Sequence, residues 1–236
     1  MSATKDIKTK GRINTKNFKT SVIIKIILAF DFLCIMFFLP AGTFLYWQAW
    51  IYMALLFIPM TFLLIYLIKH DPKLLESRMR MKEKVIEQKR IIKISWVFFL
   101  FAYLIPGFDI RYGWSHVPLW VIIVAEILVL AGYLMFAVVL RHNSYASRII
   151  EVQKKQKVIS TGPYAIVRHP MYSAILIMYI ASPLALGSYW ALLPTLAIPI
   201  VIIARILNEE KVLKKELKGY TEYTHKVRYR LIPSIW

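Results

Sequence analysis

A polar turn and a pair of glutamates flank one long apolar stretch near the end of the chain. The turn covers residues 161–172 and includes Tyr164 and His169, and the glutamates are Glu209 and Glu210. A histidine offers two ring nitrogens, and carboxylates accept hydrogen bonds from an ammonium group or from ribose hydroxyls. Tyrosine adds a hydroxyl and an aromatic face. Together these groups could hold a ligand that carries a carboxylate, hydroxyl groups and a flat ring.

The apolar stretch must position these groups, and Pro170 stands at its start. Proline suits the first turn of a helix, where the backbone N–H groups have no partner within the helix. Those donors and the helix dipole favour an anionic group in front of the helix. Tyr172, in the same turn, adds a second hydroxyl. The start of this helix is therefore a candidate binding position.

The stretch is long enough for two helices that turn at Gly187-Ser188. Segments 171–187 and 189–207 each rise about 25–28 Å as helices. The chain therefore goes out and returns, which brings Arg205 and the two glutamates back to the side of His169.

Arg205 and Glu209 are one helical turn apart and share a face. Arg205 could bind a lipid-borne carboxylate or pair with Glu209. Adjacent residues differ in direction by about 100° on a helix, so at most one of Glu209 and Glu210 points into the site. The same charges also fit a purely topological role at the membrane boundary.

The composition is that of an integral membrane protein, because hydrophobic residues make up 58% of the chain and occur in long runs. A helix needs about 20 apolar residues to cross a bilayer. Windows that approach this length are 21–40, 44–68, 91–108, 117–140, 171–187 and 189–207. The predicted fold is an all-α, multi-pass membrane helical bundle of about six transmembrane helices.

The formal net charge of +18 follows the loops. Lysine and arginine concentrate in 1–20, near 69–93 and in 141–170, whereas the connections near 41–43 and 187–188 carry no charge. This alternation is the positive-inside pattern for a chain with both termini and the site on the cytoplasmic side. The expected partners of the basic loops are membrane lipids rather than nucleic acid.

The chain divides into a basic tail and one domain. Residues 1–20 have the composition of a disordered tail. Residues 21–236 are predicted to form a single membrane-embedded domain. An interfacial helix is expected to begin near Pro72. The absence of a Gly-x-Gly-x-x-Gly element or a P-loop argues against a Rossmann or P-loop nucleotide site.

Other ionisable residues form no recognisable constellation. Glu126 lies deep in a predicted membrane helix, where a direct role and a structural pairing with Lys25 or a tyrosine hydroxyl are both open. The histidines lack metal-ligand spacing, so no metal site is predicted. The single cysteine, Cys34, rules out disulfides within the chain.

Four motifs taken together resemble the isoprenylcysteine carboxyl methyltransferase family, in its prokaryotic branch, and the related phospholipid N-methyltransferases. The motifs are residues 158–172, Arg205 with Glu209-Glu210, 219–223 and 228–233. Arg-His-Pro-x-Tyr alone is a weak signal, and its combination with the glutamate pair at hairpin spacing is specific.

The resemblance implies an integral-membrane enzyme that transfers a methyl group from S-adenosylmethionine (SAM) to a lipid-like acceptor. It also implies a cytoplasmic C-terminal cofactor pocket, with a cofactor-binding half at about 141–236. The favoured acceptor is the carboxylate of an isoprenylcysteine-like substrate. Arg205 is implied as a substrate-binding and catalytic residue, and Glu209 as a second catalytic residue. The residues implied to bind the cofactor are Gln153, Gln156, Lys157, Val158, Ile159, Tyr164, His169, Pro170, Met171, Tyr172, Glu209 and Glu210. Gln156 and Ser173 depart from the family, which often has His and Gly there.

The chemistry requires little beyond positioning, because the sulfonium methyl is already activated and a carboxylate acceptor is ionised at neutral pH. A phospholipid amine is the alternative acceptor, and it must lose a proton, for which Glu210 is a candidate base. The closing motifs are also similar to NADPH-dependent membrane reductases of the sterol reductase type. A non-enzymatic membrane scaffold is the remaining interpretation.

Overall fold

A computed structural model describes residues 15–79 and 86–236, and within them the side chains of 20–79 and 89–236. The described residues form helices and connecting turns without a β-strand. In chain order the helices are α1 (Thr15–Ala41), α2 (Trp47–His70), α3 (Pro72–Met79), α4 (Ile86–Tyr112), α5 (Leu119–His142), the short 3-10 helix η1 (Gly162–Ala165), α6 (Pro170–Ala185), α7 (Leu192–Thr195), α8 (Ala197–Glu216) and α9 (Tyr220–Lys226).

The predicted multi-pass helical bundle is confirmed. The six apolar windows coincide with α1, α2, α4, α5, α6 and the segment that contains α7 and α8. Within the described residues, five segments are long and apolar enough to cross a membrane: Thr20–Ala41, Trp47–His70, Lys89–Tyr112, Leu119–His142 and Leu192–Glu216. The remaining window forms α6, which has 16 residues and rises about 24 Å, less than a hydrocarbon core of about 30 Å.

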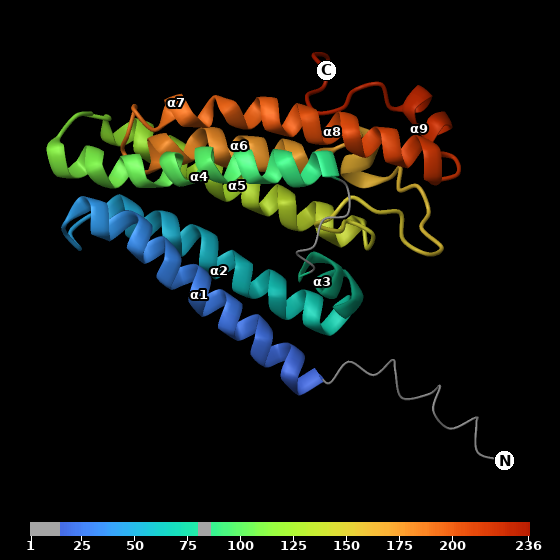
Figure 1. Cartoon of the computed structure of the whole chain (residues 1–236), viewed down its shortest axis with the longest axis horizontal. Coiled ribbons are helices and arrows are strands. Elements are labelled where there is room, and N and C mark those ends of the chain that lie inside the picture. The colour runs from blue at the N-terminus through green and yellow to red at the C-terminus, as the bar shows by residue number, and fades with distance from the viewer. Residues whose placement is uncertain (1–14, 80–85) are drawn as a thin grey trace.

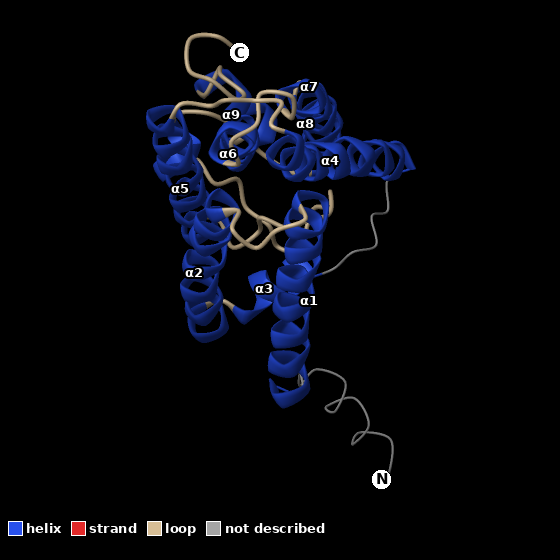
Figure 2. Ribbon diagram, turned by 90° about the vertical axis from the view of Figure 1, so that its left-hand side faces the viewer, coloured by secondary structure: helices blue, strands red, loops and turns tan. Residues whose placement is uncertain are grey.

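The helices form two groups that meet where α1 packs on α4 and α2 packs on α5 (Figure 1 and Figure 2). α4, α6 and α8 run side by side, and α1 and α2 form a hairpin that diverges from them toward the N-terminal end. Figure 2 shows α3 between the ends of α1 and α2. The hairpin predicted around residues 40–43 is present, with Gly42 at a φ of +67° in its turn.

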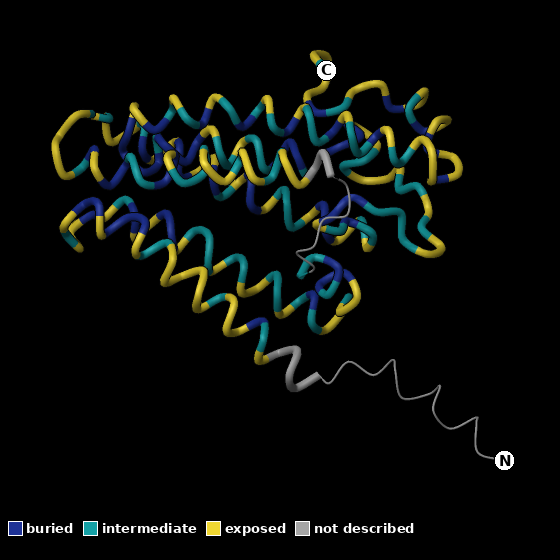
Figure 3. The backbone as a smooth tube through the Cα atoms, in the orientation of Figure 1, coloured by how far each residue is buried: buried dark blue, intermediate teal, exposed yellow. Residues whose placement is uncertain are grey.

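α5 and α6 pack closely because Gly132 has no side chain. A Cβ atom at Gly132 would lie 2.6 Å from Cγ of Met178 and 3.0 Å from the carbonyl oxygen of Ala174. α6 is therefore seated directly on α5 beneath α8. Large apolar side chains on the outer faces are exposed (Figure 3), as expected where lipid surrounds a bundle.

Buried polar contacts tie the helices together at the end away from the polar turn. The Asp109 carboxylate accepts hydrogen bonds from the hydroxyls of Ser115 and Ser188. In mid-bundle the Tyr52 hydroxyl is bonded to those of Tyr103 and Ser182 at 2.7 Å each. The turn between α6 and α8 at Gly187, with a φ of +76°, is thus held in place, as the predicted hairpin requires.

The structure also bears on three other predictions, which concern the N-terminal tail, the helix at Pro72 and Glu126. Residues 15–20 of the predicted tail belong to α1, and residues 1–14 lie outside the described part. The expected helix at Pro72 is α3, which starts at that residue. Glu126 is buried, and neither carboxylate oxygen has a hydrogen-bond partner among the described residues. The structure therefore does not show the pairing of Glu126 with Lys25 or a tyrosine hydroxyl.

Candidate methyl-transfer pocket

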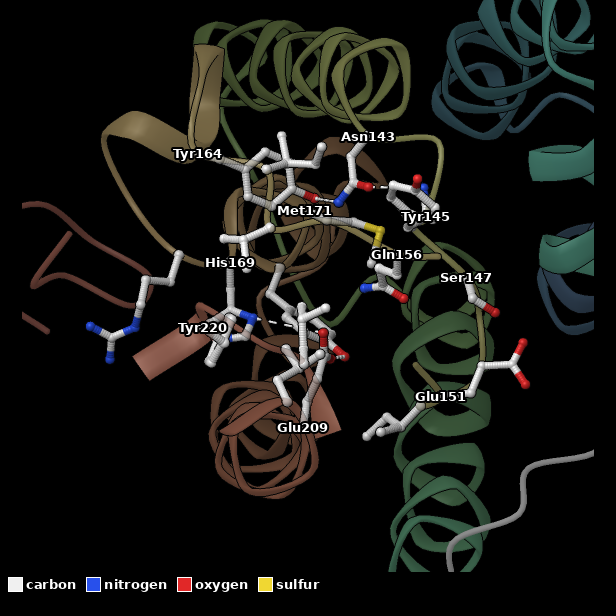
Figure 4. Close-up of a pocket in the computed structure, with 18 of the residues that line it drawn as sticks. Asn143, Tyr145, Ser147, Glu151, Gln156, Tyr164, His169, Met171, Glu209 and Tyr220 are labelled. Carbon is white, nitrogen blue, oxygen red and sulfur yellow. Dashed lines mark hydrogen bonds and ion pairs between the residues drawn. The ribbon is translucent and has the colours of Figure 1, made fainter. Parts of the chain in front are cut away.

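A pocket opens where α5 ends, α6 begins, and the last turns of α8 meet α9 (Figure 4). The loop that follows α5 forms its outer wall. Predicted site residues that line it are Gln156, Lys157, Val158, Ile159, Tyr164, His169, Met171, Tyr172, Arg205 and Glu209. Further lining residues are Asn143, Tyr145, Ala146, Ser147, Arg148, Ile149, Ile150, Glu151, Arg168, Leu213, Leu217, Tyr220 and Tyr223. The α6–α8 hairpin thus brings the polar turn and the end of α8 to one pocket, as predicted from the lengths of its two helical segments.

Three predicted cofactor residues lie outside this lining: Gln153, Pro170 and Glu210. Gln153 belongs to the outer loop, residues 143–161, and its side-chain nitrogen donates to the Tyr145 carbonyl of the same loop at 3.2 Å. Pro170 occupies the first position of α6, as predicted. Because Pro170 does not line the pocket, it could affect a bound ligand only by fixing the backbone conformation at the start of α6.

Glu210 points into the protein and is held by three donors. Its Oε1 accepts from Nε of Arg168 at 2.7 Å and lies 3.3 Å from Nε2 of His169. Its Oε2 accepts from Nε of Arg230 at 3.1 Å. Both the Glu210 and Arg168 side chains are about 95% buried. As predicted from their angular separation, only one of the adjacent glutamates, Glu209, faces the pocket.

Arg168 ties the polar turn to the C-terminal segment. Its guanidinium also donates to the carbonyls of Val227 and Arg228, at 2.8 and 2.7 Å. The backbone N–H groups of Arg168 and His169 donate to the carbonyls of Tyr229 and Arg230, both at 2.9 Å. A buried guanidinium surrounded by acceptors fixes the turn that carries His169.

The first turn of α6 is partly closed on itself. The N–H groups of Tyr172 and Ser173 donate to the His169 carbonyl at 3.0 and 3.2 Å. The Ser173 bond is the regular first bond of the helix, and the Tyr172 bond engages one of the donors that the first turn would otherwise leave free. The helix N-terminus that the sequence suggested for an anion offers fewer N–H groups to a ligand than the prediction assumed.

Tyr172 links α6 to α8 inside the pocket wall. Its hydroxyl donates to Oε2 of Glu209 at 2.7 Å and accepts from Nε of Arg205 at 3.4 Å. His169 lies beside this chain, with Nδ1 4.0 Å from Oε1 of Glu209. The Glu209 side chain is 25% exposed, so its carboxylate can still accept from a ligand.

Tyr164 closes the opposite wall. Its hydroxyl accepts from the side-chain amide of Asn143 at 2.8 Å, and its carbonyl accepts from the Tyr223 hydroxyl at 2.7 Å. Burial raises the pKa of Tyr164 to about 12, so its hydroxyl stays protonated at neutral pH. Figure 4 shows Tyr164 and Asn143 facing each other across this wall.

Arg78 of α3 supports the pocket from outside, and nothing in the sequence pattern singled it out. One guanidinium nitrogen donates to the Ala146 carbonyl at 3.0 Å and contacts Sδ of Met171 at 3.4 Å. The group also stacks over the Phe136 ring, 5.0 Å from its centroid. Burial lowers the pKa of Arg78 to about 10, which leaves it charged at neutral pH.

One protein-family model matches part of the chain. Residues 120–218, from the first turn of α5 to just beyond α8, match the model of the phospholipid methyltransferase family. The search of curated proteins finds no match. The matched segment contains the polar turn, the outer loop and the α6–α8 hairpin, so more than a third of this chain, including most of the pocket, is similar to the membrane phospholipid methyltransferases.

Proposed function

We propose that the protein is an integral-membrane methyltransferase that uses SAM and a lipid-linked acceptor. The family match covers most of the residues that line the pocket. α5 and the segment Leu192–Glu216, whose ends contribute to the pocket, are long and apolar enough to cross a membrane, which supports a site near the membrane boundary. The observation that carries the proposal is the Tyr172 hydroxyl, which joins Arg205 and Glu209 in one wall of the pocket.

The residues of the pocket fit the parts of SAM. Leu213, Leu217 and Tyr223 offer an apolar and aromatic surface for a flat ring. The Glu209 carboxylate can accept from ribose hydroxyls or an ammonium group. When bound, SAM supplies an electrophilic methyl group on a positively charged sulfur, which a pocket with carboxylates tolerates.

A carboxylate acceptor is favoured by Arg205. The guanidinium lines the same wall as Glu209 and reaches the Tyr172 hydroxyl. Guanidinium groups bind carboxylates with paired, charge-assisted hydrogen bonds. We propose that Arg205 orients the acceptor carboxylate, of the isoprenylcysteine type, and that Glu209 and Tyr172 hold Arg205 in position. No base is then required, because the acceptor is already ionised.

A phospholipid amine is the second candidate, favoured by the family that the matched segment resembles. An amine loses a proton during methylation. Glu210 accepts from Arg168 and Arg230 and does not line the pocket. In this alternative the proton acceptor would therefore be Glu209, which replaces the earlier assignment of the base to Glu210.

Calorimetry on detergent-purified protein tests the cofactor. SAM and its demethylated product are titrated alongside NADPH, using wild type, His169→Ala, Glu209→Ala and the control Lys73→Met on the exposed side of α3. The proposal predicts saturable SAM binding that is weakened in the first two variants and retained in the control. Binding of NADPH instead would support the reductase interpretation, and no binding of any of them would support a scaffold.

The acceptor is tested separately with radiolabelled SAM and protein in liposomes. A farnesylcysteine analogue and phosphatidylethanolamine are offered as acceptors. Label in the former that is lost in Arg205→Ala supports carboxyl transfer. Label only in the phospholipid would move the proposal to amine transfer.

A further inference from the structure

Tyr220 carries a hydroxyl that is buried in the pocket wall without a partner. The residue is 4% exposed and lines the pocket. Within the described part of the chain, no group accepts from or donates to its hydroxyl. Buried polar groups are nearly always hydrogen-bonded, so this hydroxyl calls for a partner that the protein itself does not provide.

The other tyrosines of the pocket show the contrast. Tyr164 is bonded to Asn143, Tyr172 to Glu209, and Tyr223 to the Tyr164 carbonyl. The Tyr145 hydroxyl donates to the Lys155 carbonyl at 3.2 Å. Tyr220 thus differs from every tyrosine with which it shares the lining of this pocket.

The position of Tyr220 is set by its turn. Gly219, with a φ of +86°, precedes it and allows the sharp change of direction from α8 into α9. The ring then packs with Leu217, Tyr223 and Val227, against Val158 and Leu213. Several of these side chains also line the pocket. The ring is therefore packed among apolar and aromatic side chains, and within the described residues these leave its hydroxyl without a partner.

The hydroxyl can act only as a neutral donor or acceptor at neutral pH. Burial, and then the nearby charges of Glu210 and Glu209, raise the pKa of Tyr220 well above its ordinary value. Figure 4 shows Tyr220 beside His169, on the side of the pocket where Glu209 lies. Carboxylates accept hydrogen bonds and repel anions, so the complementary ligand group here is an uncharged acceptor.

We propose that Tyr220 binds the nucleoside portion of the methyl donor by donating its hydroxyl proton to an uncharged acceptor atom there. This inference rests on the proposed use of SAM. A flat heterocycle fits the apolar wall, and a single placed donor fixes its orientation. The amino-acid carboxylate of the donor would be repelled by Glu209 and belongs elsewhere in the pocket.

The test separates ligand binding from folding with a matched pair of variants. Tyr220→Phe removes the unpartnered hydroxyl, and Tyr223→Phe removes a hydroxyl that is bonded within the protein. Thermal melting is measured without ligand, and calorimetry follows two probes. These are S-adenosylhomocysteine and methylthioadenosine, which has the nucleoside without the amino acid.

Tyr220→Phe should melt at the wild-type temperature or higher and bind both probes roughly 2- to 12-fold more weakly, the effect of one hydrogen bond. Tyr223→Phe should melt lower. Unchanged affinity for both probes in Tyr220→Phe, or weakening confined to S-adenosylhomocysteine, would overturn the assignment, as would a lower melting temperature. If wild type binds neither SAM nor the probes, the proposed function itself fails.

Discussion

The Tyr172 hydroxyl donates to Oε2 of Glu209 across 2.7 Å and so connects the first turn of α6 to α8. The same oxygen accepts from Nε of Arg205 at 3.4 Å. One neutral group therefore sits between a carboxylate and a guanidinium that belong to the same helix. The positions of both charged groups depend in part on this side chain.

Tyr172→Phe should disorder both charged groups while keeping the ring in place. The loss of a buried hydrogen bond to a charged group lowers the free energy of unfolding by about 1.5–3 kcal/mol. If Arg205 orients the acceptor, kcat/KM falls at least tenfold with the acceptor as varied substrate. Denaturant melts and steady-state kinetics measure the two effects. Unchanged acceptor kinetics in a folded variant would contradict the role given to Tyr172.

The two neighbouring glutamates should respond in opposite ways to the same substitution. Glu210→Gln leaves Arg168 and Arg230 without a charged partner and should destabilise the fold by about 3–5 kcal/mol. Glu209→Gln should leave the melting temperature near that of wild type but weaken SAM binding. Melting curves and calorimetry on both variants check this. A stable Glu210→Gln variant would show that the buried ion pairs are not required for the fold.

Gly162 allows the polar turn to pass close to the end of α5. It has a φ of +59°, and a Cβ atom would lie 2.4 Å from a ring carbon of His142. Gly162→Ala should therefore cost about 1–2 kcal/mol for the left-handed backbone and more for displacing His142, whose Nδ1 is 2.8 Å from the Val138 carbonyl.

A double-mutant cycle separates the two costs of Gly162→Ala. In a His142→Ala background, only the backbone cost should remain. Gly113→Ala is the matched control, because Gly113 has a φ of +65° and no atom within 4 Å of the added Cβ. Equal costs for Gly162→Ala in both backgrounds would show that the close approach to His142 has no energetic effect.

Arg78→Met should loosen the outer wall of the pocket from a distance. The substitution removes the bond to the Ala146 carbonyl and the contact with Met171. Amide hydrogen exchange in residues 143–151 should rise, and SAM affinity should fall about 3- to 10-fold, equivalent to one or two hydrogen bonds. Lys73→Met, an exposed change on the same helix, should do neither. Unaltered exchange in the loop would show that Arg78 does not hold it.

The sequence was sufficient for features that are local or periodic. The apolar runs predicted the helices, Pro170 marked the start of α6, and the angle between adjacent side chains predicted that only one of Glu209 and Glu210 faces the pocket. Features that depend on distant segments were not predictable. Arg230 donates to the second carboxylate oxygen of Glu210. It lies there because residues 229–230 are hydrogen-bonded to the backbone of residues 168–169.

The outer wall of the pocket was also beyond sequence reasoning. Residues 143–151 contain no regular helix or strand, so no hydrophobic period marks which side chains face inward. Arg78 reaches this loop from another part of the chain, and no spacing rule connects the two. The motif at 219–223 was the one signal that pointed to Tyr220, and it gave no role for the hydroxyl.

The orientation of the α6–α8 hairpin in the membrane yields the last prediction. α6 rises about 24 Å, and the turn after it carries exposed Tyr189 and Trp190, residue types that favour the membrane interface. The basic outer loop, with exposed Lys154, lies at the other end of α6. If α6 spans a locally thin bilayer, these two loops face opposite compartments.

In a Cys34→Ser background, a membrane-impermeant thiol reagent added outside intact cells should label Tyr189→Cys and leave Lys154→Cys unlabelled until the cells are opened. Labelling of both variants from the same side would show that α6 does not cross, and would reverse or abolish the predicted cytoplasmic position of the pocket.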